Sequence, residues 1–302
     1  MKKIFILGLA LWSFAAIGQV TEKELSKLKP DSIIGWKSGG LIQIGGSQVS
    51  LTNWIAGGQS SVAGNGLVNL FARKTMQKAV WENFLDLGYG LIRQGDDAAW
   101  RKTDDRIDFT SKYGRFMREN WNYTGLANFR TQFTEGVSDD GERISTFMAP
   151  GYFIAAIGLE YMPSENFSFF LAPFSSKNTF VMDQELADEG AFGVEPGSMF
   201  RSEFGGYFRM SYKRDIMENI SFQTRVELFS NYLNNPENID VNWEVLLNLR
   251  VNKYISTTLA TNLIYDDDIA IPVDRTGDGI QESTGPRTQF KQVLTVGLAV
   301  TF

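Results

Sequence analysis

The sequence contains neither cysteine nor histidine among its 302 residues. Without histidine there is no Ser-His or Asp-His catalytic pair and no imidazole ligand for a metal ion. Enzymes that depend on a catalytic histidine are therefore excluded. The absence of cysteine is compatible with an oxidising compartment and does not by itself require one.

Long apolar runs and excess positive charge are also missing. Hydrophobic residues make up 43% of the chain, yet beyond residue 20 no run approaches the length of about 20 residues that a transmembrane helix needs. A helical membrane protein is therefore excluded. The formal net charge of −6 argues against nucleic acid as a partner.

The N-terminus has the pattern of a secretory signal. Met1-Lys2-Lys3 is basic, the stretch 4–16 is apolar, and Ala16-Ile17-Gly18 offers small residues at the cleavage positions. We therefore predict a signal peptide at 1–18, a periplasmic or plug-like segment at 19–38, and one barrel domain at 39–302.

The last strand of the chain is amphipathic with a period of two. Apolar side chains at Leu294, Val296, Leu298, Val300 and Phe302 share one face, and the other face is mostly small or polar. About ten residues with this alternation suit a tilted membrane-spanning strand. The terminal aromatic resembles the C-terminal signal that outer-membrane barrels present to their assembly machinery, which we expect as a partner.

The same alternation recurs along the chain and predicts an all-β fold, a transmembrane antiparallel up-and-down β-barrel of about twelve strands. An even strand number leaves both termini on the periplasmic side. The predicted strands are 40–53, 60–73, 79–93, 106–116, 121–133, 150–162, 167–176, 200–213, 219–232, 239–251, 254–266 and 289–302.

The connections support this fold because short and long ones alternate. Short turns are predicted at 74–78, 117–120, 162–166, 217–219 and 252–253, and polar loops rich in Gly and Asp at 94–105, 134–149, 177–199 and 267–288. Short periplasmic turns and long extracellular loops are typical of outer-membrane barrels, whereas a soluble sandwich, the alternative, gives no reason for such regularity.

Several motifs resemble an outer-membrane family of the Bacteroidota type. The segments that carry the resemblance include Trp36-Lys-Ser-Gly-Gly-Leu41, Asp86-Leu-Gly-Tyr-Gly-Leu91, Ile239-Asp-Val-Asn-Trp-Glu244 and Tyr265-Asp-Asp-Asp268. That family is catalogued as domain of unknown function three-zero-seven-eight, and the motifs span nearly the whole mature chain. The resemblance implies a barrel in the outer membrane of a Gram-negative bacterium and brings no established activity with it.

The alternation also predicts which charges face the lumen, and the two signs are nearly balanced. Two interpretations remain open: interior ion pairs that stiffen a mostly closed barrel, or a narrow channel with a balanced electrostatic ladder. The predicted inward charges are Arg106, Lys112, Arg130, Arg201, Arg209, Arg225, Arg250 and Lys291, with Glu82, Asp86, Asp108, Glu160, Glu203, Glu227, Asp240 and Glu244.

The last long loop carries a candidate calcium site. Oxygen side chains alternate at Asp274, Thr276 and Asp278, and Gly279 follows at a sharp turn, as in the front half of an EF-hand loop. Gly285 stands where the closing Glu would be expected, so closure must come from elsewhere. The candidate ligands are Asp274, Thr276, Asp278, Ile280, Glu282, Asp266 and Asp268; the alternative is a solvated acidic turn.

Replacing Asp274 and Asp278 together by Ala tests this site. We expect calcium to protect the loop of the unmodified protein against protease, and the double variant to lose that protection while the barrel stays folded, because the front ligands are gone. Equal cleavage rates of the unmodified loop in calcium and in chelator would show that it is only an acidic turn.

Three functions follow as hypotheses. The first is a non-enzymatic envelope protein, an accessory or partner-binding component of a larger outer-membrane assembly; its expected contacts are outer-membrane lipid, lipopolysaccharide, and outer-membrane protein or lipoprotein partners. The second is a passive, porin-like channel for small solutes. The third, a histidine-free hydrolase, rests only on a carboxylate pair at Glu82 and Asp86, with no pocket to accompany it.

Overall fold

The computed structural model describes residues 34–51, 59–95, 99–138, 141–164, 166–252, 254–269, 271–273 and 283–301. The predicted signal peptide at 1–18, most of the segment at 19–38 and the terminal Phe302 lie outside the described residues.

Twelve antiparallel strands close into one barrel, as predicted, and each pairs with its neighbours along the chain. The barrel begins at Gly35 rather than at residue 39, because the alternation of β1 already starts there. In spatial order from the N-terminus the strands are β1 (Gly35–Val49), β2 (Ser61–Met76), β3 (Ala79–Gln94), β4 (Arg101–Arg118), β5 (Trp121–Thr131), β8 (Gly151–Ser164), β9 (Phe167–Phe180), β10 (Phe200–Met217), β11 (Ile220–Asn231), β12 (Ile239–Arg250), β13 (Ile255–Tyr265) and β16 (Gln289–Thr301).

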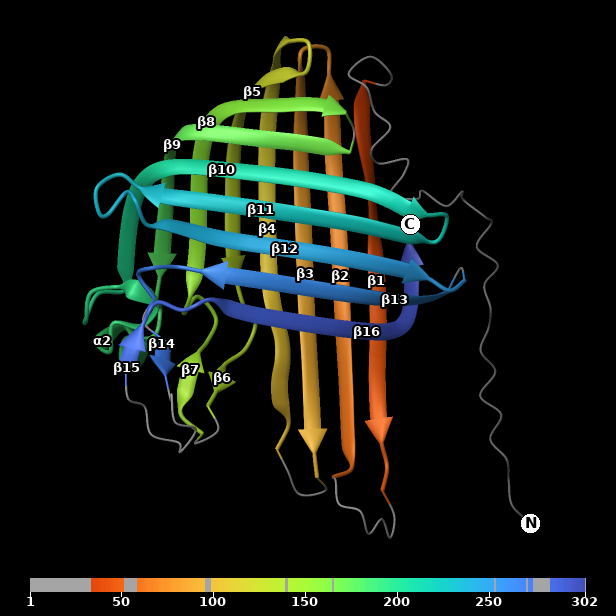
Figure 1. Ribbon diagram of the computed structural model, residues 1–302, viewed down its shortest axis with the longest axis vertical. Helices are drawn as coiled ribbons and strands as arrows, with labels where there is room; N and C mark the ends of the chain where they lie inside the picture. Colours follow the sequence, from red (N-terminus) through yellow and green to blue (C-terminus); the bar gives the residue numbers. More distant parts are fainter. Residues whose placement is uncertain are drawn as a thin grey trace.

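Strand tilt shapes the barrel. In Figure 1 the strands β10–β13 and β16 cross in front of β1–β4 at a steep angle, because strands of a closed barrel tilt relative to its axis and the two walls tilt in opposite senses in one view. The short turns gather at the upper right and the long connections at the lower left. Short turns at one end and long loops at the other confirm the predicted asymmetry.

The long connections contain small elements that the sequence did not predict. The helix α2 (Gln184–Asp188), the 3-10 turn η1 (Ala191–Gly193) and the strand pairs β6 (Gly136–Val137) with β7 (Arg143–Ser145) and β14 (Ile271–Val273) with β15 (Ser283–Gly285) lie together at the loop end (Figure 1). Ala149, Val181, Leu186, Ala187 and Val194 form a small apolar core under α2.

The barrel is apolar outside and polar inside. Exposed apolar side chains cover the strands; Ile44 is 66% exposed, Ile157 70% and Leu294 64%. Buried side chains of the interior include Thr, Asn, Ser, Asp and Glu residues. This inversion suits a barrel surrounded by lipid. In the described residues no helix has the length and apolarity to cross a membrane.

An aromatic cluster marks the short-turn end of the outer surface. The ring of Trp121 lies 4.9 Å from that of Tyr161 and 6.0 Å from that of Phe169, and Trp36 lies 5.7 Å from Trp81. These residues stand near strand ends, where amphipathic rings favour the boundary between lipid and water.

Candidate functional site

The interior carries ion pairs at three levels, and this network is the main candidate site. We name the levels by their place along the barrel. The short-turn tier consists of Arg73, Glu82, Lys112 and Glu160; the middle tier of Arg106, Asp108, Arg130, Arg209, Arg225, Glu227 and Glu244; the loop-end tier of Lys177, Arg201, Glu203, Asp240, Asp266 and Asp268.

The short-turn tier centres on one lysine. The Nζ of Lys112 on β4 lies 2.6 Å from Glu160 on β8 and 2.8 Å from Glu82 on β3. The Glu160 side chain is 2% exposed and also accepts a hydrogen bond of 3.2 Å from Thr124 Oγ1. Arg73 lies 3.5 Å from Glu82 on the other side. The tier is therefore neutral and almost dry.

The middle tier joins opposite walls of the barrel. Arg130 on β5 pairs with Asp108 on β4 at 3.1 Å and reaches Glu227 on β11. Arg225 on β11 pairs with Glu244 on β12 and approaches Asp108 to 3.6 Å. Because strands far apart around the barrel are joined, these side chains lie across the lumen rather than along its wall.

The loop-end tier carries more negative charge than positive. Lys177 on β9 pairs with Asp240 at 2.6 Å and with Asp266 at 2.7 Å. Arg201 on β10 pairs with Glu203 at 2.9 Å and with Asp268. Four carboxylates thus face two cations, and this end of the lumen is acidic.

Apolar side chains fill part of the remaining interior. Phe170 and Tyr207 contact each other in the lumen with ring centroids 6.2 Å apart, and the Lys177 ammonium lies 5.5 Å from the Phe229 ring centre. Leu126, Ala156 and Ala172 complete this cluster. The rings therefore pack inside the barrel beside the charged tiers.

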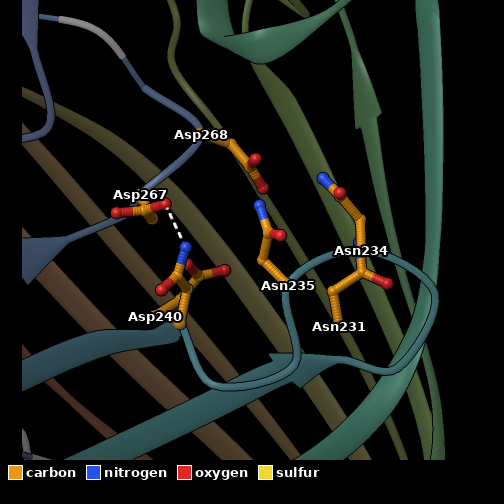
Figure 2. A pocket seen from close by; sticks show the side chains of 7 residues that line it. Asn231, Asn234, Asn235, Asp240, Asp267 and Asp268 are labelled. Atoms are coloured by element: carbon orange, nitrogen blue, oxygen red, sulfur yellow. Dashed lines mark hydrogen bonds between the residues drawn. The ribbon is translucent and has the colours of Figure 1, made fainter.

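A small polar pocket, with room for about one water molecule, adjoins the loop-end tier and shares Asp240 and Asp268 with it. Figure 2 shows its lining of amides and carboxylates, with the Asn238 amide donating a hydrogen bond to Asp267. Asn235 in the β11–β12 loop has a positive φ of 46°, which Asn tolerates better than most residues. The lining residues are Asn231, Asn234, Asn235, Asn238, Asp240, Asp267 and Asp268.

Most of the predicted inward charges belong to the tiers, with three departures. Among the described contacts, Asp86 accepts a hydrogen bond of 2.6 Å from Asn69 instead of joining an ion pair. Glu82 pairs with Lys112, so Glu82 and Asp86 do not form the predicted carboxylate pair. Arg250 is exposed at the end of β12. Lys291 is 45% exposed and pairs with Asp104 on β4.

Lys177 was missed for two reasons: the predicted strand ended at residue 176, whereas β9 continues to Phe180, and a β-bulge changes the face that Lys177 occupies. The register of β9 against β8 and β10 shifts between Ala172 and Ser175, around Pro173. A bulge adds one residue to one strand, so inward positions change from even to odd numbers along β9. The signal in the sequence is Pro173 itself, since proline inside a strand commonly marks a bulge.

Two of the candidate calcium ligands lie in the described part of the chain, and both are engaged with cations. Asp266 pairs with Lys177, and Asp268 pairs with Arg201. Within the described residues no group of three or more Asp or Glu side chains is arranged to hold a metal ion. The other candidates, Asp274, Thr276, Asp278, Ile280 and Glu282, lie outside the described residues.

Several solved outer-membrane barrels are similar to this chain at low identity. An outer-membrane channel from Pseudomonas putida F1 is 11% identical, with a TM-score of 0.39 over 90% of this chain and 97% of that one. The NanC porin is 9% identical, with a TM-score of 0.36 over 85% and 98%. The translocator domain of the autotransporter NalP from Neisseria meningitidis is 8% identical, with a TM-score of 0.34 over 90% of each. At these values no ligand or activity can be transferred.

No curated protein is significantly similar to this chain. The family comparison is more specific, although it covers a shorter part of the chain than the motifs suggested. Residues 47–137 match the family described as Protein of unknown function (DUF3078), which confirms over this segment the family resemblance predicted from the sequence.

Proposed function

We propose that this chain is a non-enzymatic outer-membrane barrel with a closed lumen, acting as a partner-binding component of an envelope assembly. The observation that carries the proposal is the cross-lumen connection in the middle tier, where Arg130 on β5 reaches both Asp108 on β4 and Glu227 on β11. A barrel whose walls are joined by buried ion pairs has no continuous water column for solutes.

The energetics favour a structural role for these charges. Asp108 and Glu227 side chains are 2% and 4% exposed, so each has lost nearly all its water. A buried charge is tolerated when paired and costs several kcal/mol when its partner is removed. Side chains that line a wet pore are screened instead and need no such pairing.

In a barrel with a closed lumen, as proposed, function resides at the outer surface, the loops and the strand edges. In our proposal the short turns and both termini face the periplasm, and the folded loops with α2 face outward. Lipid and lipopolysaccharide then surround the apolar belt, and an outer-membrane protein or lipoprotein is the partner.

Conductance in planar bilayers tests the proposal. We expect the native barrel to be silent, because the middle tier and the Phe170–Tyr207 contact occupy its lumen. Replacing Arg130 and Glu227 together by Ala removes two large side chains of opposite charge. Asp108 keeps Arg225 at 3.6 Å, whereas Arg209 loses its contact with Glu227. Conductance of that variant is expected to rise at least about tenfold, and a heat-modifiable gel shift checks that it is folded.

A large, stable conductance of the native protein would contradict the proposal and favour the porin-like alternative. The acidic loop-end tier predicts the ion selectivity of such a channel. Its four carboxylates and two cations would make the channel prefer cations to anions. Reversal potentials in a salt gradient would measure it.

A further inference from the structure

The seam where the barrel closes is much shorter than its other strand pairings. β1 and β16 pair over five residues, from Leu41 with Thr301 to Gly45 with Gly297. On its other side β1 pairs with β2 over its whole length, from Gly35 to Val49. Two-thirds of the β1 edge therefore lacks a partner among the described strands.

The β16 edge also lacks a partner strand over more than half of its length. β16 pairs with β13 from Gln289 to Leu298, and only its last residues pair with β1. Figure 1 shows β16 running beside β13 and then turning to run along β1 near the C-terminus. We call Gln289–Leu294, on the side facing away from β13, the free edge; no described strand pairs with it there. The next residue, Thr295, lies against Gly45 of β1 and accepts a hydrogen bond from Asn65 of β2.

Two glycines allow the strands to diverge. Gly45 and Gly297 are directly opposite each other, and a Cβ on Gly297 would lie 2.1 Å from the carbonyl oxygen of Ile44. A Cβ on Gly45 would lie 2.5 Å from the Cγ2 of Thr295. The backbones therefore cross at a separation that no side chain permits, and β16 turns at this point.

The free edge lies at the level of the lipid. Phe290 and Leu294 point outward from it and are 63% and 64% exposed. Its inward Lys291 pairs with Asp104 on β4, which holds this part of β16 toward that wall rather than toward β1. In hydrocarbon an unpaired row of backbone N–H and C=O groups costs several kcal/mol for each group, so exposed strand edges are avoided there.

We propose that the free edge of β16 and the facing residues Gly46–Val49 of β1 bind an extended strand of a partner polypeptide. Only a backbone supplies alternating donors and acceptors along a row of this length, which is the basis of recognition by strand addition. The bound strand has apolar side chains toward lipid and small or polar ones toward the lumen, continuing the pattern of its neighbours.

This inference rests on the proposed partner-binding function and names where and how the partner is held. Failure of this inference and failure of the proposed function can be told apart by experiment. Conductance reports on the closed lumen, whereas the experiment below reports on the seam and does not depend on whether ions pass.

Engineered disulfides test whether the seam is open. The chain has no cysteine, so new pairs are the only thiols. Continuing the register of the five observed pairs would set Gln48 opposite Leu294 if the seam closed. The control pair is Ile42→Cys with Val300→Cys, two residues that lie opposite each other in the observed seam. It is an even number of residues from the test pair, so both belong to the same type of antiparallel pair, hydrogen-bonded or non-hydrogen-bonded.

We expect the control pair to oxidise readily and the pair Gln48→Cys with Leu294→Cys to oxidise at least tenfold more slowly. Oxidation of both pairs at the same rate would mean that β1 and β16 close along their length and would overturn the proposal. Intermolecular cross-linking through Leu294→Cys alone, at stoichiometric yield, would overturn it in favour of self-association.

A synthetic peptide with the sequence of β13, Ile255–Tyr265, then serves as the probe strand, because that sequence already pairs with β16 on its other side. Binding to the purified barrel in detergent is followed by fluorescence anisotropy. We expect affinity to fall at least tenfold when Gln48→Cys with Leu294→Cys is forced closed by strong oxidant, and to recover on reduction. A scrambled peptide of the same composition is the control.

Two results would contradict the proposal: no binding of the β13 peptide to the reduced barrel, or equal binding to the reduced and oxidised forms. Oxidising the control pair at Ile42 and Val300 is expected to leave binding unchanged, because those residues are already joined.

Discussion

Replacing Lys112 by Met is expected to lower the free energy of unfolding by about 3–5 kcal/mol, the usual cost of removing one partner of a buried ion pair. Lys112 is the cation shared by Glu160 and Glu82, at 2.6 and 2.8 Å. After the substitution Glu82 still has Arg73 nearby. The Glu160 carboxylate, which is 2% exposed and still charged, keeps only the hydrogen bond from the Thr124 hydroxyl. The measurement is the denaturant concentration at which the heat-modifiable folded band disappears.

A second substitution separates loss of pairing from loss of packing. Lys112→Met combined with Glu160→Gln removes both the cation and the charge that needs it, and most of the lost stability is expected to return. Lys78→Met, in the exposed β2–β3 turn, is the matched control and should change stability by less than about 0.5 kcal/mol. If the double variant is as unstable as Lys112→Met, the lost stability comes from packing around the lysine and not from an unpaired Glu160.

Replacing Gly158 by Ala is expected to destabilise the barrel by about 3 kcal/mol or more, at the upper end of overpacking effects. A Cβ on Gly158 would lie 2.0 Å from the carbonyl oxygen of Leu171 and 2.5 Å from the Cα of Ala172. Both contacts are with the backbone of β9, beside the bulge at Pro173, so no side-chain rotation relieves them. The barrel must bend or lose strand pairing there.

Gly125→Ala provides the control for this prediction. Gly125 lies on the adjacent strand β5, opposite Ile157, and a Cβ there would meet nothing within 4 Å. We expect this variant to fold with stability near that of the native protein. Refolding into lipid vesicles, followed by gel mobility with and without boiling, compares the two. Equal folding yields would mean that the close approach at Gly158 is not maintained in the membrane.

The arrangement of strands was predictable because a lipid-exposed barrel alternates at every second residue. All twelve barrel strands occur where that alternation placed them, with ends displaced by only a few residues in most cases. The starts are displaced most at β1, which begins at Gly35 rather than at residue 40, and at β4, which begins at Arg101 rather than at residue 106. In β4, Lys102 and Asp104 continue the alternation through a segment that reads as a polar loop. Apolar periodicity cannot locate the end of a strand that projects beyond lipid.

The inward charges were mostly predictable for the same reason, but their partners were not. Arg130 pairs with Glu227, 97 positions later, and Lys291 pairs with Asp104, 187 positions earlier. Such contacts depend on the height and tilt of strands on opposite walls, which local periodicity does not encode. Asp266 and Asp268 show the consequence, because their ion pairs with Lys177 and Arg201 could not be read from the sequence. Their role as calcium ligands stays a prediction.

By itself the sequence determined the class of fold, the number of strands, the asymmetry of the connections and the exclusion of histidine chemistry. These follow from composition and from a period of two, both of which are local. Tertiary structure alone decided that the tiers cross the lumen, that the bulge at Pro173 turns Lys177 inward, and that β16 leaves β1 at Gly45 and Gly297. Each depends on how closely two backbones approach, and that distance is set only when the barrel closes.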